Sequence, residues 1–191
     1  MKKLLLVVML LFTGAFTNAQ NGFHQKKVTV LPSSQLAING DTNINKFQCD
    51  FDTAFLKEAQ QVYYSRKDSI MDFTGAILVL NTRGFDCGNK GINQDFHDLI
   101  KSDKYPEIHL EISKVKLRTK TFGVATICIT MAGKQKFYEV PINIKDGEIA
   151  QFQGELELNI KDFKLEPPKK LFGIIVVKDE IEISFDLKVK K

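Results

Sequence analysis

Apolar and polar residues alternate with a period of two through most of this chain. Between residues 180 and 190, isoleucine, phenylalanine, leucine and valine occupy the odd positions, and charged residues or serine occupy the even ones. Such alternation is typical of β-strands that bury one face and expose the other. The pattern recurs often enough for about eight strands joined by short links, so the sequence predicts an all-β protein.

Several of the expected strands can be bounded. Residues 69–81 are long enough for one full strand with Met71, Phe73, Ile77 and Val79 on one face. Two later hairpins are marked by turn residues, Ala132-Gly133-Lys134 and Asp146-Gly147. Further alternating stretches predict strands at residues 28–31, 36–38, 47–51, 108–112, 149–160 and 181–189.

One segment departs from the pattern. Ile92, Phe96, Leu99 and Ile100 are spaced i, i+4, i+7 and i+8, which places them on one face of a helix. Asn89 is suited to cap the start of this helix, and the restriction on the residue before Pro106 requires it to end by Tyr105. We therefore expect a single short helix at residues 91–102, serving as a wall or lid beside the strands.

An antiparallel sheet of this length with one apolar face can close into a barrel or fold into a sandwich. Pro167-Pro168 cannot lie in a central strand, so it predicts a corner before the last strand. The residues themselves leave both architectures open. In a barrel, the question for function is what fills the interior.

The N-terminus has the features of a secretory signal peptide. Lys2 and Lys3 precede an apolar stretch from Leu4 to Phe12, and small residues follow at 17–19. We predict that residues 1–19 are a signal peptide and that residues 20–191 form one domain. No later stretch approaches the roughly 18 apolar residues of a spanning helix. The expected location is therefore the periplasm or the exterior of the cell.

Charge and cysteine content narrow the function further. Removal of residues 1–19 leaves 25 Lys and Arg against 23 Asp and Glu, a net charge of +2. This near-neutral balance argues against a nucleic-acid partner. Export permits a disulfide among Cys49, Cys87 and Cys128, and the odd count leaves one thiol over. The sequence does not choose the pair; we favour Cys49 with Cys87, because Cys87 lies at a strand end where the chain can adjust.

Several short motifs together resemble those of the YceI-like family. They are Lys104-Tyr105-Pro106 after the helix, Met131-Ala132-Gly133-Lys134, and Asp162-Phe163 followed by Pro167-Pro168 and Asp179-Glu180-Ile181. The segments Ser34 to Gly40 and Phe47-Gln48-Cys49 match as well. The resemblance covers nearly all of residues 20–191, and the cysteine pattern is similar to that of exported members from Bacteroidota-type bacteria.

The resemblance implies an antiparallel, eight-stranded, lipocalin-like β-barrel with one short α-helix. It also implies an apolar lumen that holds a polyisoprenoid or other long-chain lipid, such as an isoprenoid quinone, with no other cofactor required. The family has no shared catalytic motif to carry over. Its lumen contacts vary, so the lining is predicted here from alternation alone: Phe47, Phe73, Ile77, Ile108, Leu110, Ile112, Phe137, Phe152, Leu156, Leu158, Ile183 and Phe185.

A barrel of this size can also be filled by its own side chains. The alternative is therefore a non-catalytic structural or stress-related interaction module without a ligand. Catalysis is not expected, because His24, His97 and His109 lie far apart and no metalloprotease, Cys-x-x-Cys or nucleophile-elbow motif occurs. No metal site is predicted. An imperfectly closed barrel would leave a strand edge free for pairing, which keeps a homodimer open.

Overall fold

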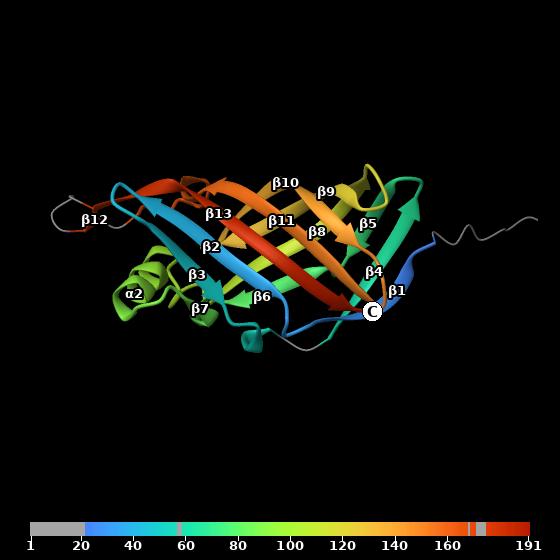
Figure 1. Cartoon of the computed structure of the whole chain (residues 1–191), viewed down its shortest axis with the longest axis horizontal. Coiled ribbons are helices and arrows are strands. Elements are labelled where there is room, and N and C mark those ends of the chain that lie inside the picture. Colours follow the sequence, from blue (N-terminus) through green and yellow to red (C-terminus); the bar gives the residue numbers. More distant parts are fainter. Residues whose placement is uncertain (1–21, 57–58, 168, 171–174) are drawn as a thin grey trace, which may run out of the picture.

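The computed structural model describes residues 22–191 except 57–58, 168 and 171–174. The predicted signal peptide at residues 1–19 therefore lies outside the described residues, as does Pro168 of the predicted corner. Among the described residues, strands dominate and there is a single α-helix, α2, at Lys90–Leu99. The helix lies at one end of the elongated molecule, and the C-terminus lies toward the other (Figure 1).

The strands follow one another with few long connections. They are β1 (His24–Val30), β2 (Gln35–Thr42), β3 (Lys46–Phe51), β4 (Gln60–Lys67), β5 (Ile70–Thr74), β6 (Ile77–Asn81), β7 (Phe85–Asp86), β8 (Glu107–Leu117), β9 (Phe122–Met131), β10 (Lys134–Lys145), β11 (Ile149–Asn159), β12 (Lys169–Lys170) and β13 (Ile175–Lys190).

Eight of these strands form a closed antiparallel ring, in the order β1-β4-β5-β8-β9-β10-β11-β13. The ring closes because the last residues of β13 pair with β1, with Thr29 opposite Lys190 and Val30 opposite Val189. The eight-stranded antiparallel barrel is thereby confirmed. Closure removes the exposed edges that an open sheet of this length would present.

The wall of the barrel is split at the helix end. There β2, β3 and β7 continue the sheet from the first half of β13, while β6 pairs with β8. No ladder joins β3 directly to β6 in the described part of the chain. We call the boundary between β3 and β6 the seam. The short strand β7, which follows β6 in the chain, pairs with the end of β3 across this boundary.

The predicted single strand at residues 69–81 is wrong. Gly75, with a φ of 77°, ends β5, and β6 begins again at Ile77. β8 carries a register shift between Ile112 and Lys114, so its inward positions change from even-numbered to odd-numbered residues. The strands paired with the two parts of β8 therefore differ as well: odd-numbered residues face inward in β5, and even-numbered residues face inward in β6. As a result Met71 faces inward with Val115, whereas Ile77 pairs with the exposed Glu111. Ile77 is therefore wrong as a lining residue.

Phe137 is also wrong as a lining residue, since its side chain is 70% exposed. It lies on β10 between Lys136 and Tyr138, and the inward positions of that strand are the even-numbered Tyr138, Val140 and Ile142. The aromatic type suggested an inward position, but the register of the β9–β10 hairpin points Phe137 outward.

The helix and the first predicted hairpin are confirmed. The Asn89 side chain accepts from the Ile92 amide at 2.9 Å, and the apolar face buries Phe96 and Ile100. At the hairpin, Ala132 and Gly133 have φ values of 47° and 71°. Positive φ at both central residues is the type I′ geometry that matches the strand twist. This turn fixes which residues of β9 and β10 face inward.

Candidate functional site

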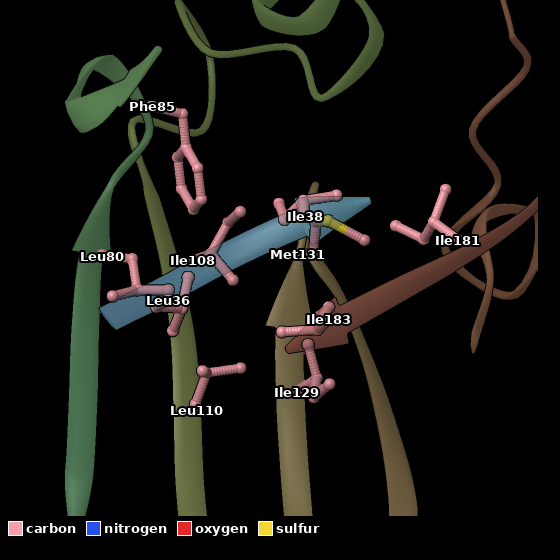
Figure 2. Close-up of a pocket in the computed structure, with 10 residues that line it drawn as sticks. All are labelled: Leu36, Ile38, Leu80, Phe85, Ile108, Leu110, Ile129, Met131, Ile181 and Ile183. Atoms are coloured by element: carbon pink, nitrogen blue, oxygen red, sulfur yellow. The ribbon is translucent and has the colours of Figure 1, made fainter. Parts of the chain in front are cut away.

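The interior of the barrel is apolar. At the helix end it contains a void of about 20 Å³, and Figure 2 shows the side chains around it converging from β2, β6, β8, β9 and β13. All ten lining residues are apolar: Leu36, Ile38, Leu80, Phe85, Ile108, Leu110, Ile129, Met131, Ile181 and Ile183. Nothing in this lining titrates or donates a side-chain hydrogen bond, so the void is suited to hydrocarbon and not to a polar group.

Most of the lining predicted from the sequence does lie inside the barrel. Apart from Ile77 and Phe137, the predicted residues belong to the core or pack directly against it: Phe47, Phe73, Ile108, Leu110, Ile112, Phe152, Leu156, Leu158, Ile183 and Phe185. Only Ile108, Leu110 and Ile183 of that set reach the void itself. Whether any of them contacts a ligand stays a prediction.

Sequence reasoning missed part of the void lining. Leu36, Leu80, Ile129 and Met131 all lie on inward positions of alternating stretches, so the signal was present. The predicted lining favoured phenylalanine and did not include these four residues. Phe85 carried no strand signal, because β7 is only two residues long. Its place in the lining depends on the tertiary fold.

Three aromatic rings and a disulfide hold the helix end together. The ring centroid of Phe51 on β3 lies 4.9 Å from that of Phe85 on β7. The Phe85 centroid lies 5.1 Å from that of Phe96 on α2. The Cys49–Cys87 disulfide joins β3 to the segment before α2, and both cysteines are buried. The favoured pairing is thus the one the structure contains. These contacts cover the seam and anchor α2 over it.

The motif residues after the helix explain why the lid has a fixed position. A Cβ atom added at Gly133 would lie 2.8 Å from the nearest atom of the Tyr105 ring. The ring therefore packs directly on the β9–β10 turn. The next residue, Pro106, accepts from the Thr82 amide at 2.9 Å and from its hydroxyl at 3.1 Å. The Lys-Tyr-Pro and Ala-Gly motifs therefore meet in space and tie the exit of α2 to the rim of the barrel.

The opposite end of the interior is less tightly covered. Leu117, Ile144, Phe152 and Leu187 occupy inward positions near the strand ends farthest from α2, yet all four stay only partly buried. Apolar side chains on an inward face lose solvent contact when a core closes over them. Their residual exposure shows that solvent reaches inward-facing side chains at this end. We refer to these four residues as the far end.

Titratable groups do not assemble a reactive site in the described chain. His109 contacts Glu107 at 3.0 Å on the surface, and His24 lies beside the ring of Tyr64. His97 Nε2 and the Ser102 hydroxyl are both buried without a hydrogen-bond partner among the residues described. No group of three metal-binding side chains occurs among the residues described. Burial, followed by the nearby Glu111, raises the pKa of the free Cys128 thiol, which disfavours its reactive form.

A closed antiparallel barrel with an apolar interior and a helix over one end is a lipocalin-like fold. Residues 33–189 match the family model for the YceI-like domain. The chain therefore belongs to the YceI-like family, as the sequence motifs predicted. No comparison tests the Bacteroidota origin, which stays a prediction. A search of curated proteins found no match.

Solved structures show the same fold. BcnA from Burkholderia cenocepacia is 21% identical, with a TM-score of 0.65 over 83% of this chain and 96% of that one. A polyisoprenoid binding domain from Saccharophagus degradans, implicated in plant cell wall breakdown, is 12% identical, with a TM-score of 0.62 over 85% and 97%. The Campylobacter jejuni YCEI protein is 14% identical, with a TM-score of 0.51 over 91% and 86%. At these identities the likeness establishes the fold alone.

None of the helices described here is long and apolar enough to span a membrane.

Proposed function

We propose that this protein is exported to the periplasm or the cell exterior and binds the apolar tail of a polyisoprenoid or another long-chain lipid, including an isoprenoid quinone. The observation that carries the proposal is the wholly apolar lining of the interior void. Family membership adds support, since one solved neighbour is itself described as a polyisoprenoid binding domain. The signal-like residues 1–19 support export.

Burial of the tail supplies the binding energy. Each buried carbon group contributes about 0.8 kcal/mol, so three isoprene units give roughly 12 kcal/mol before costs. Association costs at least about 4 kcal/mol. The remainder, about 8 kcal/mol, corresponds to micromolar affinity. Because no polar contact contributes, selectivity among tails of similar length is expected to be weak.

A tail needs more room than the void offers. About 20 Å³ holds roughly one water molecule. A bound tail must therefore displace interior side chains. The far end is where inward-facing side chains remain in contact with solvent, and the seam is a boundary that no ladder of the described strands closes. The displacement costs free energy, so affinity falls below the figure expected for a preformed cavity.

Organic extraction of the purified full chain tests the proposal. Mass spectrometry of the extract is expected to recover a stoichiometric long-chain lipid, and the delipidated protein is expected to take up a fluorescent farnesyl probe with a dissociation constant above the micromolar value of a preformed cavity. An empty extract together with no uptake would contradict lipid binding.

A second function is favoured by the small size of the void. A barrel filled by its own side chains would act as a structural or stress-related interaction module without a ligand. The same experiment separates the two functions, because this module would yield an empty extract and bind no probe. Neither function requires catalysis.

A further inference from the structure

The outer face of the barrel carries a second hollow, which differs from the interior void in its polar lining. It is an open groove of about 1050 Å³ across β9, β10, β11, β13, β2 and β3. Figure 1 shows several of these strands running side by side on the face turned to the viewer. Most lining side chains are outward-facing amides, carboxylates and small residues, so the groove differs in chemistry from the interior void.

The strand register places the polar residues of the groove in one row. Phe122 lies opposite Asn143, Asn143 opposite Gln153, Gln153 opposite Asp186, and Asp186 opposite Gln35. All five residues line the groove. Four spacings of about 4.8 Å between neighbouring strands make this row about 19 Å long. It runs across the strands, so every strand contributes one side chain.

A second row supplies the floor. Glu155 lies opposite Ser184, Ser184 opposite Ala37, and Ala37 opposite Asp50. The two central members are small, and the polar row on one side projects longer side chains. The groove therefore exists because alanine and serine occupy the centre of a face where longer polar side chains surround them.

Hydrogen bonds within the groove hold its acceptors in place. Gln151 and Gln153 both donate to the Asp186 carboxylate, at 2.8 to 3.1 Å, and Gln48 donates to Asp50 at 2.6 Å. These carboxylates are oriented by amides and not by lysine or arginine. Their remaining lone pairs are free to accept from a ligand, since an ionised carboxylate has about four acceptor positions.

The composition of the lining restricts the ligand. It includes Asp50, Glu155 and Asp186 but neither lysine nor arginine, which excludes a polyanion such as nucleic acid or a phosphorylated chain. A purely cationic ligand would use the carboxylates but leave the amide donors of Asn143 and Gln35 unmatched, since an ammonium group has no acceptor. Hydroxyl groups both donate and accept, so they match both kinds of side chain.

We propose that this groove binds a linear neutral oligosaccharide. Its hydroxyls pair with the amides and carboxylates of the row, and the apolar face of a terminal sugar packs on Phe122, whose ring is 37% exposed. The row accommodates roughly four hexose units across its about 19 Å. The proposal does not rest on lipid binding, because the polar row lies on the outward face of the strands, although Leu36, Phe51 and Phe185 of the core also border the groove.

Calorimetric titration of the full chain with cellohexaose, maltohexaose and mannohexaose tests the groove. At least one sugar is expected to bind with a dissociation constant of millimolar or below. A comparison with spermine and with hexagalacturonate tests the charge argument. If spermine alone binds, or if no sugar binds at millimolar concentration, the proposal is overturned.

Matched variants locate the binding. Asn143→Ala and Gln153→Ala together are expected to weaken sugar binding roughly tenfold, from loss of two hydrogen-bonding side chains. Gln135→Ala is the control, because it removes an exposed amide from the opposite end of β10, outside the groove. Circular dichroism checks folding of each variant. Unchanged affinity in the folded double variant, or equal weakening by Gln135→Ala, would place the sugar elsewhere and overturn the proposal.

Discussion

The two ends of the barrel interior are built from the same alternating sequence pattern, yet they pack differently. At the helix end, Cys49, Phe85 and Ile129 are at most 3% exposed. At the far end, inward-facing residues such as Ile144 and Phe152 stay only partly buried. The difference comes from what covers each end. A disulfide, three aromatic rings in tilted contact and α2 cover the first, and strand ends with short loops cover the second. Cross-links and fully buried side chains are thus concentrated at the helix end, and partly exposed inward side chains at the far end.

The largest expected effect on this comparison follows from removing the disulfide. A link that closes a sequence separation of 38 residues stabilises the fold by about 4 kcal/mol in the chain-entropy model. Cys49→Ala with Cys87→Ala is therefore expected to lower the free energy of unfolding by about 4 kcal/mol, measured by chemical denaturation. Cys128→Ala is the control, because Cys128 is a free thiol. Equal losses in both variants would show that the link does not carry the stability of the helix end.

A matched pair of isoleucines sharpens the contrast between the ends. Ile129 is 1% exposed and lines the void, whereas Ile144 on the neighbouring strand is partly exposed at the far end. We expect Ile129→Ala to cost about 3 kcal/mol and Ile144→Ala about 1 kcal/mol, because a cavity is costly only where the surroundings are closely packed. Urea denaturation measures both. Equal costs would mean that the far end is as well packed as the helix end.

Much of the fold could be predicted from the sequence, because the signals were local. Alternation gave the all-β class, and the spacing of Ile92, Phe96 and Ile100 gave the helix. Barrel closure was not local. It depends on two pairs between β1 and the end of β13, and the residues alone also allowed a sandwich. The family resemblance, and not periodicity, decided that choice.

The candidate site was predicted less well, for two physical reasons. A single register shift in β8, with a break at Gly75, reversed the facing of Ile77 that unbroken alternation implied. The outer groove depends on which residues of five strands lie opposite one another, as in the row from Phe122 to Gln35. No single strand contains that information, so sequence periodicity could not find it.

Two phenylalanines on opposite faces test whether the interior takes up a tail. Phe185 packs against the core, with its ring over Gly154, whereas Phe137 is 70% exposed. Phe185→Asp is expected to weaken uptake of a fluorescent farnesyl probe at least tenfold, because a carboxylate placed against the apolar core opposes a hydrocarbon ligand. Phe137→Asp should leave uptake unchanged. Undiminished uptake by a folded Phe185→Asp protein would contradict binding in the interior.

The smallest expected effect concerns the base of α2. The Asn93 side-chain amide donates to Asp86 at 3.0 Å, and the Gly88 amide does so at the same distance, which lowers the pKa of Asp86 below its ordinary value of 3.8. Since the folded pKa is the depressed one, this stabilisation is present above the unfolded pKa and is lost as the pH falls through the folded pKa. Because Asp86 is exposed, the effect on overall stability is expected to be small.

NMR titration of the Asp86 carboxyl group measures its pKa directly. The Asp86 midpoint is expected below 3.8, and Asn93→Ala should raise it, because the amide of Asn93 is the largest cause of the shift. The Asn93 side chain also accepts from the Cys87 amide at 2.6 Å, so the same substitution loosens the chain beside the disulfide. Asp86→Asn separates the two effects, since it removes the charge and leaves that second bond intact. A midpoint at or above 3.8 in the unsubstituted protein would show that the polar contacts at the base of α2 are not formed in solution. The helix end would then owe its order to the disulfide and the aromatic rings alone.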